Sequence, residues 1–279
     1  MGIYPYAAGV THEDSFKDWF GWPAQQYIEF FNSTVSWADA RSQLAGAVQR
    51  RIQKPARIDW AMPLTVVGTS LLDVANGSND SDFAYFAETI LLAQSSWPIQ
   101  IRLGWEMNGT WYPWAGMDKP MDYISAWRRV VGLIKGISNR FVFTWSPNWT
   151  WGENGVITNP EVCYPGDNFV DYIGMSCYFV AAYDNENPYY AWLYKKNSPY
   201  GLDWLVAFAK KHGKPPVISE WGISRDGAQE YVKAFGQYLI DNNFAWANYW
   251  DANNDEFVCR LSDGQYPDTG KQFKQTFSS

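Results

Sequence analysis

The stretch IQIRLGWEMNGTWYPWAG, residues 99–116, changes character halfway and indicates how the chain folds around it. Isoleucine and leucine alternate through residues 99–103, with Arg102 as a charged interruption, and this alternation predicts a buried strand. The second half holds one proline and two glycines, which predict a loop. Glu106 therefore leaves a buried strand among large rings that have no core of their own to fill. This arrangement is typical of a site that handles a flat, polar, ring-shaped molecule.

The composition of the whole chain supports that interpretation. A chain of 279 residues that is 47% hydrophobic and 18% charged can bury a large core, in one domain or two. Its 17 tryptophans and 18 tyrosines often stand beside Asn, Asp, Gly and Pro rather than in apolar runs. Such rings favour a carbohydrate-binding surface, because sugar C–H faces stack on them while the flanking polar groups bond hydroxyls.

Charge and cysteine content exclude several other classes. The net charge is −7 and no Lys/Arg-rich run occurs, so nucleic acids and anionic membranes are poor partners. Two histidines, with Cys163, Cys177 and Cys259 in no paired spacing, give no convincing metal site, and we expect no metal and no cofactor. No apolar run reaches ~18 residues, so we expect no transmembrane helix.

The segment MGIYPYAAGV has no basic region followed by an apolar one, so it does not resemble a signal peptide. We expect a monomer that is secreted or periplasmic after removal of a leader. Two glycosylation sequons fall within the ring-rich region, where a glycan would obstruct a cleft, and this favours a bacterial source.

Short apolar runs alternate with longer amphipathic stretches along the whole chain. The expected helices cover 36–54, 81–96, 121–137, 202–212 and 228–242, whereas the helices after the first and sixth strands are less obvious. The expected strands are 3–9, 27–32, 57–64, 99–106, 141–147, 172–178, 216–222 and 246–251.

Eight strands that alternate with helices in ~250 residues predict an α/β protein, a (β/α)8 TIM barrel formed as a single domain over 1–279. A doubly wound open sheet is the alternative, but no Gly-rich phosphate-binding motif follows the first strand. In a barrel the functional residues lie at the carboxyl ends of the strands. The residues expected to point into this one mouth are Glu106, Trp145, Tyr178, Glu220 and Trp250.

Two of these residues are carboxylates among apolar neighbours. Such groups are unfavourable when buried unless they are paired or used. One possibility is a structural ion pair, for example between Glu220 and Arg102. The other is an acid/base and nucleophile pair, which retains configuration at a separation of ~5–5.5 Å and inverts it at ~6.5–9.5 Å.

The segments RLGWEMNGTWYPWAG and VISEWG resemble the strand-four and strand-seven motifs of clan A glycoside hydrolases, and most closely those of glycoside hydrolase family 26. The resemblance implies a retaining, endo-acting enzyme with Glu106 as acid/base and Glu220 as nucleophile. Arg102 matches the family's strand-four arginine, an even four residues before Glu106 on the same strand face. Tyr178 matches the tyrosine that supports the nucleophile.

The same resemblance assigns binding residues for a polysaccharide or oligosaccharide. Trp250 is expected to be the sugar platform at the cleavage subsite, and other rings to line further subsites, although each ring could equally belong to the core. The remaining candidates are Trp105, Asn108, Trp111, Trp114 and Trp145, with Trp149 and Trp151 as additional rings.

One residue departs from the family pattern. Mannanases of family 26 usually carry a histidine just before the acid/base, where this chain has Trp105. The substrate is therefore left open among β-glucan, a bacterial exopolysaccharide, xylan and β-mannan, and the alternative function is a non-catalytic carbohydrate-binding barrel. The segment DANNDE, 251–256, begins like a calcium loop but lacks its glycine and its last glutamate, so we expect sugar binding there instead.

Overall fold

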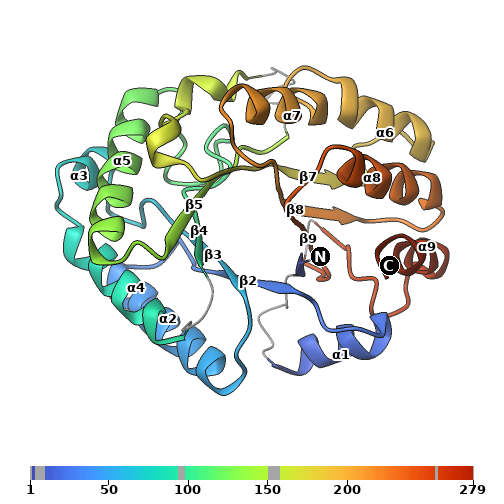
Figure 1. Cartoon of the computed structure of the whole chain (residues 1–279), viewed down its shortest axis with the longest axis horizontal. Coiled ribbons are helices and arrows are strands. Elements are labelled where there is room, and N and C mark those ends of the chain that lie inside the picture. The colour runs from blue at the N-terminus through green and yellow to red at the C-terminus, as the bar shows by residue number, and fades with distance from the viewer. Residues whose placement is uncertain (1, 4–9, 94–97, 150–157, 255–256, 279) are drawn as a thin grey trace. The chain divides into compact units, whose positions relative to one another are not determined.

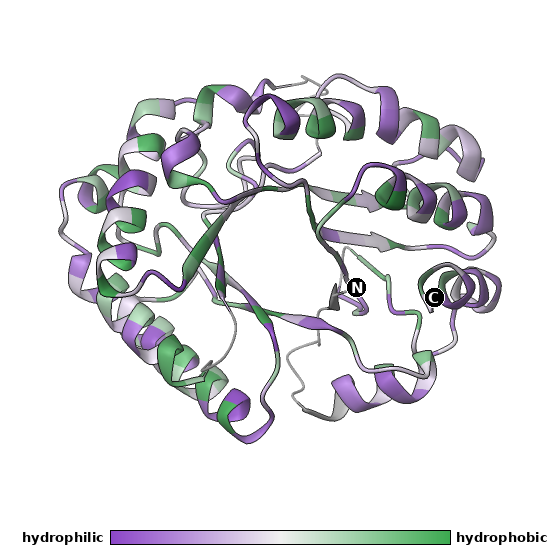
Figure 2. Cartoon of the chain, viewed as in Figure 1, coloured by the Kyte–Doolittle hydropathy of each residue, from purple (hydrophilic) through white to green (hydrophobic). Residues whose placement is uncertain are grey.

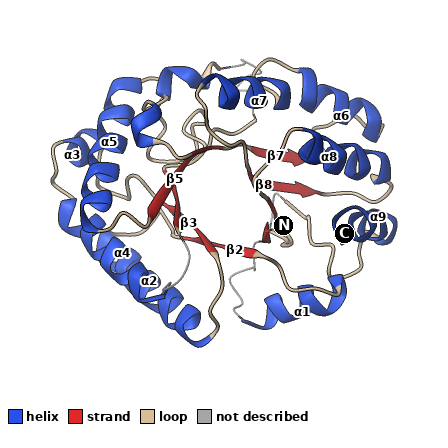
Figure 3. Cartoon of the chain, in the orientation of Figure 1, coloured by secondary structure: helices blue, strands red, loops and turns tan. Residues whose placement is uncertain are grey.

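The computed structural model describes residues 2–3, 10–93, 98–149, 158–254 and 257–278. Within them, helices and parallel strands alternate along the chain (Figures 1 and 3), as expected for an α/β protein. The strands are β1 Gly2–Ile3, β2 Gln26–Phe30, β3 Ile58–Met62, β4 Ile99–Leu103, β5 Phe141–Trp145, β6 Tyr172–Ile173, β7 Ser176–Phe179, β8 Ile218–Ile223 and β9 Ala247–Tyr249. The helices are α1 Val10–Phe20, α2 Trp37–Gln53, α3 Leu71–Ala75, α4 Asp80–Ala93, α5 Pro120–Ile137, α6 Pro188–Asn197, α7 Leu202–Lys211, α8 Gln229–Asp241 and α9 Pro267–Phe277.

The chain forms two compact units, one of residues 29–174 and one of residues 1–28 with 175–279. We refer to them as the central unit and the terminal unit and describe each by itself. The expectation of a single domain stays a prediction.

In the central unit, strands β3, β4, β5 and β6 pair in parallel in that order. Helix α2 packs on α4, and α5 packs on both α3 and α4, on the outer side of these strands (Figure 1). The helical period expected in α5 is confirmed, because Ile124, Trp127, Val131 and Ile134 are all buried. Figure 2 shows hydrophobic and hydrophilic residues alternating around these helices, as one buried face requires.

In the terminal unit, β2 pairs with β1, β1 with β9, β9 with β8, and β8 with β7, all in parallel. Trp221 of β8 points away from its neighbour Glu220, toward the helices, because side chains alternate along a strand. There its indole stacks on Phe273 of α9 at 5.7 Å and meets Phe235 of α8 at 4.5 Å. Helix α8 in turn packs on α9 and α6.

Several expected boundaries are wrong. The strand expected over 172–178 is broken after Ile173 into β6 and β7, and the strand expected over 99–106 ends at Leu103. The two helices that were less obvious from the sequence, α1 and α6, are present. Helix α9 was not among the expected helices. Of the expected first strand, 4–9 lies outside the described residues. None of the described helices combines the length and apolar character that crossing a membrane would require.

Candidate active site

Glu106 stands on an unusual piece of backbone. Strand β4 ends at Leu103, and both Gly104 (φ 46°) and Glu106 (φ 55°) are in the left-handed region. The Glu106 N–H donates to the carbonyl of Ser146 at 2.7 Å, just after β5. The expected even spacing with Arg102 on one strand face is therefore wrong, since alternation ends three residues before the glutamate. A left-handed non-glycine residue carries strain of about 1–2 kcal/mol, which is characteristic of functional positions.

Gly104 makes this turn possible. A Cβ there would lie 2.8 Å from the Leu64 Cβ, closer than side chains pack. Its carbonyl accepts a hydrogen bond from the Tyr123 hydroxyl at 3.0 Å, so the turn is anchored to helix α5. The backbone path after β4 is thus fixed, and this path determines the position of Glu106.

The residues after the turn form a closed loop over 105–116, which we call the acidic loop because it carries Glu106. The Gly116 N–H donates to the Met107 carbonyl at 2.8 Å and so joins its two ends. The Trp114 indole donates to the Trp105 carbonyl at 2.6 Å. Compact loops that are packed by their own side chains are frequently functional.

The ring of Trp111 contacts the carboxylate of Glu106. Its indole N–H donates to Glu106 Oε2 at 3.0 Å, while half of its side chain stays exposed. The ring lies directly against Gly109, where a Cβ would approach it to 2.3 Å. A side chain at position 109 would clash with the indole, so the glycine there allows Trp111 to reach Glu106.

Trp105, the departure from the family pattern, is 3% exposed. Its indole N–H donates to the Tyr112 hydroxyl at 3.0 Å, and Tyr112 in turn stacks on Trp114 at 4.5 Å. The Phe30 ring meets Trp105 edge-on at 5.5 Å. Trp105 is therefore held by Tyr112, a ring of the same segment that was not among the expected binding residues.

Arg102 is fully buried in β4. Its Nε lies 3.5 Å from Asp59 Oδ2, and its guanidinium lies over the rings of Phe30 and Trp105 at 5.0 and 5.6 Å. Asp59 is two residues before Ala61, the strand partner of Arg102, and so shares its face. The sequence signal for Asp59 was a carboxylate inside an expected buried strand.

Three other expected binding residues of the central unit are turned inward. The Asn108 amide donates to the Asn148 carbonyl and accepts from the Asn148 N–H, both at 2.8 Å, and so ties the acidic loop to the segment after β5. Trp114 and Trp145 are fully buried, so neither ring offers a face to a ligand in this structure. Trp149 is half-buried, and Trp151 lies outside the described residues.

Glu220 lies within β8 of the terminal unit, not at its end, and is 5% exposed. The Tyr178 hydroxyl donates to its Oε2 at 2.7 Å. Ser176 is the strand partner of Glu220, so Tyr178, two residues further along β7, lies on the same face. Gly222 makes room for the tyrosine, because a Cβ there would lie 3.0 Å from Tyr178 Cδ1.

The Tyr178 ring is held by two further rings. Trp250, half-buried just after β9, meets it edge-on at 6.5 Å, and Phe257 packs on it at 4.7 Å. The backbone N–H of Trp250 donates to the backbone carbonyl of Trp221 at 2.7 Å, which fixes the backbone of Trp250 to β8. Phe257 was not predicted as part of the site, because the short run Phe257, Val258 and Cys259 shows no pattern that sets this ring apart.

The segment 251–256 bonds to its own loop. Asp251 Oδ1 accepts the N–H groups of Leu261 and Ser262 at 2.7 and 3.1 Å, and Asn253 Oδ1 accepts that of Arg260 at 2.9 Å. Residues 255–256 lie outside the described residues. Within the described part of the chain, no three His, Cys, Asp or Glu side chains gather as metal ligands would.

Comparison with solved structures identifies the fold. The structure is similar to the catalytic domain of a GH26 endo-β-1,4-mannanase from Bacillus sp. JAMB-750, with a TM-score of 0.67 and 16% identity over 95% of this chain and 79% of that one. It is similar to a Bacillus subtilis mannanase, with a TM-score of 0.67 and 15% identity over 96% and 83% of the two chains. A GH26 β-mannanase from Bacteroides ovatus gives 0.59 and 18% over 94% and 80%. The fold is therefore of the (β/α)8 class, as expected.

Comparison of sequences identifies the family. Residues 81–260 match the model of glycosyl hydrolase family 26. Endoglucanase H of Acetivibrio thermocellus is 31% identical over 210 residues, which is 68% of this chain. The chain spans 21% of the length of that relative. The chain belongs to glycosyl hydrolase family 26, and the resemblance found in the sequence is confirmed.

Proposed function

We propose that this chain is a retaining glycoside hydrolase. Glu220 attacks the anomeric carbon while Glu106 gives its proton to the departing glycosidic oxygen, so that the C–O bond breaks and a glycosyl ester forms. Glu106 then takes a proton from water, which attacks the same carbon and releases Glu220.

The observation that carries the proposal is the way each carboxylate is held. Both glutamates are almost buried, and in each one Oε2 accepts a hydrogen bond from a neutral ring donor, Tyr178 for Glu220 and Trp111 for Glu106. A carboxylate fixed by a neutral donor keeps its other oxygen directed, and a fixed orientation is what attack or proton transfer needs. The strained backbone at Glu106 supports the same role.

The roles are tested by substitution. Glu220→Ala should abolish turnover, and azide should restore it by forming the glycosyl azide of inverted anomeric configuration. Glu106→Ala should preserve the first step on substrates with good leaving groups, since they need little protonation. Near-native turnover by Glu220→Ala would refute the assignment, and a product of inverted configuration by NMR would refute the retaining mechanism.

The substrate we propose first is a β-linked glucan, cut within the chain. The relative at 31% identity is named an endoglucanase, whereas the mannanases are similar in fold alone. Trp111 and Trp250 are each partly exposed, and each would stack against a sugar ring. A position that contacts a sugar hydroxyl can change substrate preference by orders of magnitude, and we propose that Trp105, which stands where family mannanases usually have histidine, influences the preference here.

A polysaccharide panel tests this choice. Mixed-linkage glucan, mannan, xylan and a bacterial exopolysaccharide should be incubated with the wild type and with Trp105→His, and the products analysed for mass and linkage. Glucan cleavage in the wild type is expected. Strong mannan cleavage by the wild type would contradict it, and binding without new reducing ends would favour the non-catalytic alternative.

A further inference from the structure

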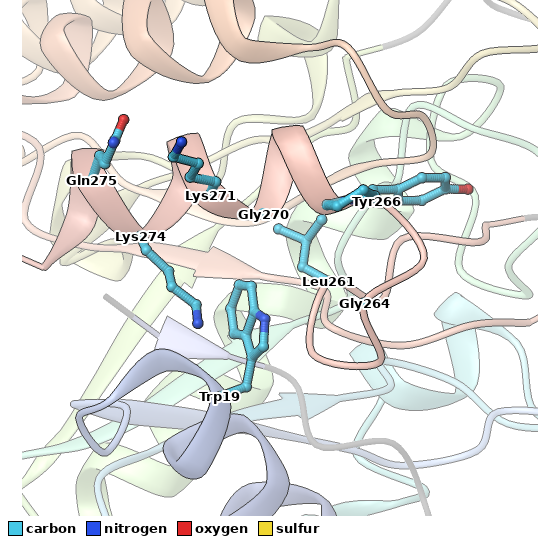
Figure 4. Close-up of a pocket in the computed structure, with 9 residues that line it drawn as sticks. Trp19, Leu261, Gly264, Tyr266, Gly270, Lys271, Lys274 and Gln275 are labelled. Atoms are coloured by element: carbon cyan, nitrogen blue, oxygen red, sulfur yellow. The ribbon is translucent and has the colours of Figure 1, made fainter.

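A pocket of about 420 Å³ lies in the terminal unit between helices α1 and α9 and the loop before α9 (Figure 4). Its size falls within the ~300–1,000 Å³ typical of small-molecule sites. It shares no residue with the candidate active site. The described residues that line it are Trp19, Leu261, Gly264, Tyr266, Pro267, Gly270, Lys271, Lys274 and Gln275.

Two of its walls are aromatic rings in fixed positions. The Tyr266 hydroxyl donates to the Val258 carbonyl at 3.1 Å, which locks that ring. The Trp19 ring packs on Phe273 of α9, with 6.0 Å between ring centroids. It also lies close to Gly270, where an added Cβ would be 3.1 Å from the Trp19 ring. The pocket is therefore preformed and presents ring and apolar surface.

The polar groups of the pocket are mostly donors. Lys271 and Lys274 stand three residues apart on α9 and both line the pocket. The Lys274 ammonium lies 4.5 Å above the Trp19 ring, whereas the exposed Lys271 side chain points away from that ring (Figure 4). No acidic side chain is among the described lining residues. Within the described part of the chain, neither lysine forms an ion pair with a carboxylate. This positive site occurs in a chain of net charge −7.

We propose that this pocket binds a hexuronate, a sugar ring that carries a carboxylate. The carboxylate would pair with the Lys274 ammonium, and with that of Lys271 once this exposed side chain turns toward it, while a C–H face of the sugar would lie on the Tyr266 and Leu261 wall. The choice of a sugar acid over another ring-shaped carboxylate rests on the proposed function. The proposed glucan carries no carboxylate, so the sugar acid would belong to an acidic polysaccharide that accompanies it rather than to the chain that is cleaved.

Methyl β-D-glucuronoside is the probe, titrated into the full chain and followed by ligand-observed NMR. The wild type should bind it, and methyl β-D-glucoside and acetate should bind far more weakly. Lys271→Gln with Lys274→Gln should weaken binding roughly tenfold, as expected for two partly exposed ion pairs. The matched control removes two exposed lysines elsewhere, Lys210→Gln with Lys233→Gln, and should leave binding unchanged.

Trp19→Phe is a second variant that keeps a ring in the wall but removes the indole edge and the larger face, and it should also weaken binding. Equal binding by the pocket double variant, equal binding of the neutral glucoside, or competition by acetate at equal concentration would overturn the inference. If no polysaccharide is cleaved but this binding pattern holds, the proposed function fails and the pocket stands. If polysaccharide is cleaved but the glucuronoside does not bind, only the pocket fails.

Discussion

Gly109 has no side chain, and this lets the Trp111 ring lie against it and donate a hydrogen bond to Glu106. Gly109→Ala should push the Trp111 ring away from the carboxylate, because the new methyl would lie 2.3 Å from it. A hydrogen bond to a charged group is worth about 1.5–3 kcal/mol, so kcat should fall roughly tenfold to a hundredfold. Steady-state kinetics on the polysaccharide that the wild type cleaves measures the effect.

Gly132→Ala in helix α5 is the matched control, since nothing lies within 4 Å of its added methyl. It should leave kcat unchanged. Trp111→Phe removes the indole N–H without changing the glycine and should give a similar loss. Wild-type kcat in Gly109→Ala would show that Trp111 does not position the carboxylate.

Tyr178→Phe removes the hydroxyl that lies 2.7 Å from Glu220 Oε2 and leaves the ring packed on Phe257 and Trp250. We expect kcat to fall roughly tenfold to a hundredfold, with a melting temperature close to that of the wild type. Tyr183→Phe, at a residue that is 77% exposed, is the control. An equal loss of kcat in both variants would remove Tyr178 from the site.

At the scale of the elements, the exit from β4 depends on Gly104. Gly104→Ala should lower the free energy of unfolding by about 2 kcal/mol or more, because the left-handed backbone and the contact with Leu64 both oppose a side chain. Gly213→Ala has the same left-handed backbone with open space around it, and should lose only about 1 kcal/mol. Urea unfolding of both variants separates the two effects, and equal losses would show that the Leu64 contact is unimportant.

The elements that the sequence predicts are those whose pattern repeats. Helix α5 repeats its buried positions from Tyr123 to Ile134, and β4, β5 and β8 are short buried segments rich in apolar residues. Breaks within the strands were missed, because a left-handed turn at Gly104 depends on Leu64, far away in sequence. Helix α9 was missed because its surface is polar and only a few positions are buried.

The same distinction applies to the candidate site. The two glutamates stand out because a carboxylate among apolar residues is rare, and Trp111 stands out as a ring in a loop. Which rings are exposed could not be derived from their spacing, so Trp114 and Trp145 were expected as sugar contacts although both are buried. Tyr112 and Phe257 acquire their positions from ring packing, which no local pattern records.

At the scale of the whole chain, all three thiols are buried and free. Burial raises the pKa of Cys163 to about 12 and of Cys177 to about 11, and it also raises that of Cys259. The thiolate is the reactive form, so Ellman's reagent at pH 8 should find no thiol in the native protein and three after unfolding. Rapid reaction of one native thiol would show that its burial is not maintained in solution.

The raised pKa of Cys163 also predicts alkaline destabilisation. Below pH 9.0, the ordinary pKa of a thiol, Cys163 is protonated in both the folded and the unfolded state, so its burial does not lower the free energy of unfolding. Between pH 9.0 and about 12 the unfolded chain releases this proton and the native chain keeps it, so stability falls as pH rises. The slope approaches about 1.4 kcal/mol per pH unit for this thiol, and urea unfolding of Cys163→Ala should show a shallower fall.

The acidic loop closes on itself, and this has a consequence for how the family can diversify. The bonds from Trp111, Trp105, Trp114 and Gly116 all end within the same twelve residues, while Glu106 and Asn108 bond outward to Ser146 and Asn148. We expect this segment to be exchangeable between relatives only together with the segment after β5, whereas single changes inside it disturb several partners at once. Glu220 instead accepts its hydrogen bond from a tyrosine that is 42 residues away in the sequence. We therefore expect substitutions at these two positions to occur together during evolution.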